Sequence, residues 1–101
     1  MTDATITRHD DRSRYEAVLD DRVAGHVEFQ LANDLIVITH TEVDPAFEGR
    51  GVGSALARTV LDDVRADGSR KVLIVCPFIT AWIGRHPEYG DLLYGSRQQP
   101  G

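Results

Sequence analysis

Residues 43–54 read VDPAFEGRGVGS, and this stretch decides the fold because it joins two different sequence patterns. The segment before it, Leu35–Val43, opens with four apolar residues, three of them β-branched, which is typical of a central strand covered on both faces. The segment after it repeats apolar residues at helical spacing: Val52, Leu56, Val60 and Val64. Gly68 is a suitable C-terminal cap for this helix, and Lys71–Cys76 has the pattern of a second buried strand. We therefore expect residues 35–76 to form a parallel strand pair joined by a right-handed crossover through the helix.

The first third of the chain has the pattern of antiparallel hairpins. Ile6–His9 and Arg14–Leu19 are compatible with one strand that is broken or bulged around the charged residues 9–12. A further strand is expected over residues 23–31, where Gly25 marks a weak point or a bulge. Short turn signals at residues 20–21 and 33–34 favour hairpin connections.

A short amphipathic helix is expected after Cys76-Pro77, with Cys76 as its N-cap. The predicted fold class is therefore α/β, or α+β by some conventions. It has a mixed, mostly antiparallel sheet of four or five strands, one parallel βαβ crossover and two helices. We expect a single domain over residues 1–101, with its core at about 6–92 and a flexible tail at 95–101.

Composition excludes several classes of protein. The chain has 101 residues, enough for one domain, and its net charge of −5 argues against a general nucleic-acid binder. A single cysteine excludes an intrachain disulfide and a multi-cysteine metal site. The longest apolar run, residues 72–76, is far too short to span a bilayer, and residues 1–4 lack the pattern of a secretory signal. We expect a cytoplasmic protein with no membrane partner.

The glycines at 49, 51 and 53 predict an anion site. A loop that leaves a strand and enters a helix presents unpaired backbone N–H groups, and glycines let a phosphate approach the main chain. The alternative is a tight turn packed under the helix. A P-loop is excluded because Gly53 is followed by Ser54-Ala55, and a Rossmann site is excluded because position 56 is leucine.

Three reactive side chains lie near the expected strand ends beside this loop: His40, Glu42 and Cys76. Cys76 is either a small buried residue or a nucleophile whose thiolate the helix N-terminus would stabilise. His40 is either a strand histidine or a base or partner of the thiol, and Glu42 is either a solvated carboxylate or a base. The remaining histidines lack metal-ligand spacing, and Phe78 and Trp82 are expected in the core.

Two groups of motifs resemble the GNAT acetyltransferase superfamily. The acetyl-CoA-binding motif is matched by Val43-Asp44-Pro45 followed by Gly49-Arg50-Gly51-Val52-Gly53 and Leu56. Residues 40–43, Cys76-Pro77 and residues 86–89 further resemble its short, single-domain YjdJ-type branch. The resemblance covers about residues 6–92. One position departs from the pattern, because Glu48 stands where Gln or Arg is usual, and we expect its carboxylate to point to solvent.

The resemblance implies that acetyl-CoA is a co-substrate and that no metal is needed. The implied coenzyme contacts are Val43, Gly49, Arg50, Gly51, Val52, Gly53 and Ser54. A pantetheine arm would enter a splay between Leu35–Val43 and Lys71–Cys76, and a backbone N–H near Val43 would polarise the thioester carbonyl.

The acceptor implied by the resemblance is an amine: a protein lysine, an N-terminus or a small molecule. Transfer is either direct, with Glu42 or His40 as base, or through an acetyl group on Cys76. A shallow, open acceptor site and a monomer or weak homodimer are expected. The alternative is a module or sensor that binds CoA or acyl-CoA without turnover.

Overall fold

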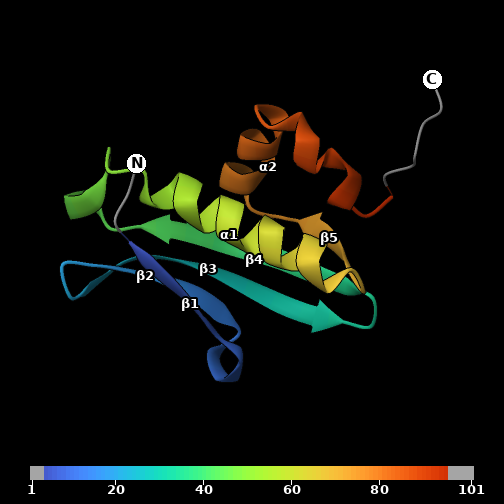
Figure 1. Cartoon of the computed structure of the whole chain (residues 1–101), viewed down its shortest axis with the longest axis horizontal. Coiled ribbons are helices and arrows are strands. Elements are labelled where there is room, and N and C mark those ends of the chain that lie inside the picture. Colours follow the sequence, from blue (N-terminus) through green and yellow to red (C-terminus); the bar gives the residue numbers. More distant parts are fainter. Residues whose placement is uncertain (1–3, 96–101) are drawn as a thin grey trace.

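The computed structural model describes residues 4–95, which form a five-stranded sheet with helices along one face and one edge (Figure 1). The strands follow chain order across the sheet: β1 (Thr5–His9), β2 (Arg14–Leu19), β3 (Arg22–Ala32), β4 (Leu35–Val43) and β5 (Lys71–Ile74). Neighbouring strands are antiparallel except β4 and β5, which are parallel. The helices are α1 (Val52–Asp67) and α2 (Pro77–Gly84), with 3₁₀ turns at Asp10–Arg12, Pro45–Phe47 and Pro87–Leu92. The predicted fold class is confirmed.

The N-terminal strand prediction is wrong in one respect. Residues 5–19 are two antiparallel strands and not one broken strand, because the charged residues Asp10–Arg12 form a 3₁₀ turn. Ser13 then adopts a left-handed conformation, with φ of 53°, and reverses the chain. The expected tail at 95–101 lies almost entirely outside the described residues.

Helix α1 covers one face of the sheet with its apolar stripe. Leu56, Val60 and Leu61 are fully buried against the strands, and each such side chain contributes about 1.5–3 kcal/mol when it leaves water. The helix ends as predicted at Gly68, whose left-handed backbone lets its N–H donate to Val64 O.

Tyr15 donates a hydrogen bond to Asp63 and so connects β2 to α1. Burial of the Tyr15 hydroxyl raises its pKa.

Strand β4 is not covered on both faces, as the run of apolar residues had predicted. Ile36 and Ile38 are buried under α1, but Val37 and Leu35 on the other face are partly exposed. The predicted second buried strand is also shorter, since β5 ends at Ile74 and leaves Lys71 and Leu73 exposed. Alternate residues of both strands, Leu35, Val37 and Leu73, therefore lie on a face of the sheet that has no helix over it within residues 4–95.

Helix α2 begins as expected, with Cys76 as N-cap and Pro77 as its first residue. It lies alongside α1 in Figure 1, and Trp82 Nε1 donates to Ser54 Oγ at 2.9 Å.

No helix within residues 4–95 has the length and apolar character needed to cross a membrane.

The strands β3 and β4 carry irregularities that position the end of β4. Ala24 is an extra residue in β3, next to Gly25, where a bulge was expected. In β4 the extra residue is Thr39, because Phe29 pairs with Ile38 and Glu28 pairs with His40. This bulge reverses the side-chain alternation, so that Thr41 and Val43 share the α1 side of the sheet with Ile38.

We expect Gly25→Ala to destabilise the fold by about 1–3 kcal/mol. A Cβ at this position would lie 2.8 Å from Glu42 O and 3.2 Å from both Leu56 Cδ1 and Val52 Cγ1, so backbone or helix must move. Urea denaturation of the two proteins measures the change in unfolding free energy.

Gly84→Ala is the matched control, since Gly84 is exposed and a Cβ there would meet nothing within 4 Å. This variant should be neutral or slightly stabilised. Equal stability of Gly25→Ala and wild type would contradict the close approach of α1 to β3.

Candidate functional site

Strands β4 and β5 stop pairing half-way along β4. Their last paired residues are Ile38 and Ile74, and Val75 N donates to Ile38 O at 2.9 Å. Beyond this point β4 continues to Val43 with only β3 as a partner. The parallel strands therefore diverge and do not end side by side, which leaves an edge of β4 unpaired inside the sheet.

The backbone of Val43 points into this gap. Asp44 N donates to Ala24 O at 2.8 Å, so the amide of residue 44 faces β3. Successive residues of a strand direct their N–H groups to opposite sides, which turns the N–H of Val43 away from β3. A hydrogen-bond donor thus faces the space between the two diverging strands.

The glycine loop supplies further free donors. Within residues 4–95, the N–H groups of Gly49, Gly51, Val52, Gly53 and Ser54 have no hydrogen-bond acceptor. Arg50 is the exception in this loop, because its N–H is not free and donates to Phe47 O at 3.2 Å. Gly49 and Gly51 have φ of 82° and 77°, a left-handed conformation that favours glycine. Five free donors beside the positive end of α1 form an electrostatic environment suited to an anion.

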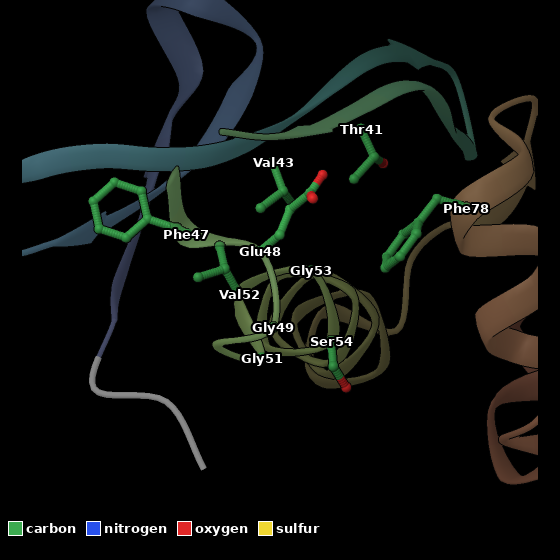
Figure 2. A pocket seen from close by; sticks show the side chains of 10 residues that line it. All are labelled: Thr41, Val43, Phe47, Glu48, Gly49, Gly51, Val52, Gly53, Ser54 and Phe78. Atoms are coloured by element: carbon green, nitrogen blue, oxygen red, sulfur yellow. The ribbon is translucent and has the colours of Figure 1, made fainter. Parts of the chain in front are cut away.

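A cavity of about 380 Å³ connects the loop to the gap (Figure 2). Thr41 and Val43 of β4 form one wall, the start of α1 forms another, and Phe78 of α2 lies at one end. Its lining residues are Thr41, Val43, Phe47, Glu48, Gly49, Gly51, Val52, Gly53, Ser54 and Phe78.

The predicted coenzyme contacts lie in this cavity with one exception. Arg50 does not line it. Its guanidinium lies 5.9 Å from the centre of the Phe47 ring and 4.0 Å from Asp20 Oδ2. Ser54 lines the cavity, while its hydroxyl accepts the hydrogen bond from Trp82.

Glu48 is exposed, yet its side chain lines the cavity on the side of Val43 and Thr41 (Figure 2). The carboxylate is thus exposed to solvent, as expected, but it also faces the cavity, which was not expected. Its negative charge lies at a site that the free backbone donors of the glycine loop otherwise make favourable to an anion.

Cys76 lies behind the cavity wall. Its side chain is 5 % exposed, and Sγ lies 3.3 Å from Thr41 Oγ1, a contact that joins the end of β4 to the start of α2. Although Cys76 is the N-cap of α2, its sulfur makes no capping hydrogen bond.

His40 and Glu42 point to the opposite face of the sheet from Thr41 and Val43, because side chains alternate along β4. His40 Nε2 lies 3.3 Å from Glu42 Oε1, and both side chains are mostly exposed. The expected convergence of these two groups with Cys76 beside the glycine loop is therefore not observed. Cys76 belongs to the α1 side of the sheet, and the histidine and carboxylate belong to the other side.

Sequence reasoning missed Thr41 and Phe78. Phe78 was expected in the core, but it is 39 % exposed and lines the cavity, whereas Trp82 is buried as expected. Thr41 could have been identified from the sequence, because side chains alternate along a strand and Thr41, two residues before Val43, shares its face. Nothing comparable identifies Phe78, whose position depends on how α2 packs beside Gly53.

The model of a family described as GCN5-related N-acetyl-transferase matches residues 14–92. No sequence among the curated proteins matches the chain. An NMR structure of a GCN5-like protein from Staphylococcus aureus superposes with a TM-score of 0.71 at 20 % identity, covering 99 % of this chain and 97 % of that one.

Two longer proteins share the fold. The ribosomal-protein-S18-alanine N-acetyltransferase from Escherichia coli has a TM-score of 0.63 and 19 % identity over 82 % of this chain and 54 % of its own. Rv2747 from Mycobacterium tuberculosis, solved in complex with CoA and NLQ, has a TM-score of 0.59 and 29 % identity over 74 % of this chain and 47 % of its own. The chain thus spans about half the length of these two proteins.

We expect Gly53 and Phe78 to be energetically coupled, because a Cβ on Gly53 would lie 2.6 Å from Phe78 Cζ. Gly53→Ala should displace the Phe78 ring. It should therefore lower the free energy of unfolding more in wild type than in a Phe78→Ala background, where the ring is absent. A double-mutant cycle by urea denaturation should give a coupling of about 0.5–3 kcal/mol. Additive effects would contradict this packing.

Proposed function

The chain belongs to the GCN5-related N-acetyltransferase family, and on that premise we propose that it transfers an acetyl group from acetyl-CoA to an amine acceptor. The observation that carries the proposal is the row of unpaired amides at the start of α1, which opens into a cavity leading to the gap in the sheet. The diphosphate of the coenzyme matches the unpaired amides at the start of α1. Its long arm, which carries amide groups, matches the cavity that leads to the gap in the sheet.

The loop residues fit the diphosphate of the coenzyme. Backbone N–H groups of Gly49, Gly51, Val52, Gly53 and Ser54 would donate to its oxygens, and the dipole of α1 favours the negative charge. The unpaired edge of β4 offers donors and acceptors to the amides of the pantetheine arm. Arg50, which is half-exposed beside the loop, is suited to an outer phosphate.

The thioester would then lie near the N–H of Val43. Attack by the acceptor nitrogen on the carbonyl carbon places negative charge on the carbonyl oxygen, and a donor at that point stabilises it. The C–S bond breaks, the coenzyme leaves as the thiol, and the acceptor nitrogen gives up a proton. His40 and Glu42 are the candidate bases, and their place on the other face of the sheet supports an approach of the acceptor from that side.

A covalent route through Cys76 is the alternative mechanism. In it the Cys76 thiolate attacks the thioester carbonyl, the C–S bond breaks and the coenzyme leaves as its thiolate. The acceptor amine then takes the acetyl group, which restores the Cys76 thiolate, and the proton that the amine loses converts the coenzyme thiolate to the thiol. The contact of Sγ with Thr41 Oγ1, which lines the cavity, supports this route. The burial of Cys76 behind the wall favours direct attack.

The acceptor side of the site is open. His40 and Glu42 are 53 % and 63 % exposed, and no helix covers their face of the sheet within residues 4–95. An open face with carboxylates suits an exposed cationic amine, such as a protein lysine or N-terminus. A CoA-binding module without turnover is the second candidate, since the reactive side chains lie on two different faces.

We expect Glu48→Gln to tighten binding of CoA, because it removes a carboxylate from the opening of an anion site. An exposed charge interaction of about 0.2–1 kcal/mol corresponds to an increase in affinity of up to about fivefold. Isothermal titration calorimetry with CoA measures the effect. Glu88→Gln, an exposed carboxylate outside the cavity, is the control and should bind as wild type does. Weaker binding by Glu48→Gln would contradict the assignment.

We expect the double variant His40→Asn, Glu42→Gln to lose about 10²-fold or more in kcat/KM for a panel of amines, the usual contribution of a general base. Its affinity for CoA should stay within about twofold of wild type, since neither side chain lines the cavity. Release of CoA thiol measures transfer. If wild type binds CoA tightly but transfers acetyl to no amine, the proposed transfer is contradicted and the CoA-binding module is the function.

Intact mass after rapid quenching separates the two routes. An acetyl adduct on wild type that is absent from Cys76→Ala identifies the covalent route. Turnover by Cys76→Ala at the wild-type rate, with no adduct on either protein, identifies direct attack.

A further inference from the structure

A cluster of two imidazoles and a carboxylate lies on the uncovered face of the sheet, formed by His26, His40 and Glu42. We propose that this cluster binds a single divalent transition-metal ion of the zinc type. Its ligand atoms all lie within 4.8 Å of one another. The proposal does not depend on binding of acetyl-CoA.

Strand register brings the three residues together. His26 pairs with Glu42 across β3 and β4, and Glu28 pairs with His40. These residues alternate with residues that are buried in β3 and half-buried in β4, so their side chains share the face opposite to α1. The rings of His26 and His40 are 5.8 Å apart between centroids. The sequence spacing predicted no metal ligands because the cluster comes from two strands.

His26 is the fixed member of the cluster. Its side chain is only 16 % exposed, and its Nε2 is buried without a hydrogen-bond partner among residues 4–95. Glu28 Oε2 lies 3.2 Å from this nitrogen, but the arrangement does not have hydrogen-bond geometry. A buried polar atom without a partner is costly, and coordination of a cation would remove that cost.

The other two ligands are free to adjust. His40 and Glu42 are more than half exposed, so small side-chain rotations meet little resistance. Tetrahedral zinc with ligands at about 2.0–2.2 Å requires the ligand atoms to lie roughly 3.3–3.6 Å apart. The ligand atoms, which lie within 4.8 Å of one another, must therefore move closer, and the exposed side chains of His40 and Glu42 have the freedom to do so.

The donor set selects the class of metal. Two imidazole nitrogens and one carboxylate oxygen suit Zn²⁺, Co²⁺ or Ni²⁺, whereas Mg²⁺ and Ca²⁺ prefer oxygen ligands. Glu28 Oε2 already accepts a hydrogen bond from Arg14 at 2.9 Å, so water is left to complete the coordination. A metal on His40 would occupy the nitrogen that a general base needs, so metal binding and proton abstraction at His40 exclude one another.

The experiment is titration of the full chain, without a histidine tag, with Co²⁺ alone and then Zn²⁺ alone. We expect one Co²⁺ per chain with a visible d–d absorption band, displacement of Co²⁺ by Zn²⁺, and no response to Mg²⁺. Imidazole nitrogen resonances of His26 and His40, followed by NMR, should shift on addition of Zn²⁺.

Three variants and a control test the ligand set. His40→Asn and Glu42→Gln change exposed residues and should each weaken Co²⁺ binding at least tenfold, as should His26→Asn. His86→Asn is the control, because His86 stacks on Trp82 away from the cluster and an amide can replace its Nδ1 contact with Trp82 O. It should bind Co²⁺ as wild type does.

Absence of Co²⁺ and Zn²⁺ binding in the submillimolar range would overturn the proposal. So would binding that His40→Asn and Glu42→Gln leave unchanged, or that His86→Asn abolishes. None of these outcomes bears on CoA binding, because none of the three ligands lines the cavity beside the glycine loop. Acetyl transfer is measured separately, without added metal.

Discussion

The divergence of β4 and β5 after Ile38 and Ile74 is the constraint on which the rest of the site depends. A strand inside a sheet normally has partners on both sides, and unpaired backbone groups are tolerated only where water or a ligand can satisfy them. Two local features produce the divergence. Thr39 adds a residue to β4, and Pro77, which has no N–H to donate, turns the chain from β5 into α2. The sheet thus opens where the chemistry is expected.

Close packing of α1 brings its N-terminus to this opening. Gly25 lets the helix approach β3 and β4, since any side chain there would overlap Glu42 O, Leu56 and Val52. The free amides of the glycine loop and the free edge of β4 therefore face one cavity. A helix terminus and a strand edge, each with unsatisfied donors, together form a site that neither provides alone.

The two faces of the sheet differ in character. The α1 side is apolar and packed, while the other side carries the ion pair of Arg14 with Glu28 and the hydrogen bond between His40 and Glu42. The gap between β4 and β5 lies where these two environments meet. An acetyl donor held on the α1 side would use one set of residues, and an amine or a metal ion held on the other side would use a different set. Binding of the acetyl donor can therefore be altered without changing the residues of the other side.

The sequence by itself determined the crossover unit, the start and end of α1, the N-cap at Cys76 and the composition of the glycine loop. These features depend on local periodicity and on backbone conformations that glycine and proline restrict within a few residues. Only the tertiary structure decided that Phe78 lines the cavity, that Cys76 and His40 lie on different faces, and that His26 meets His40. Those outcomes depend on cross-strand register and on a single inserted residue, Thr39, which changes the direction of every later side chain in β4 without any periodic signal in the sequence.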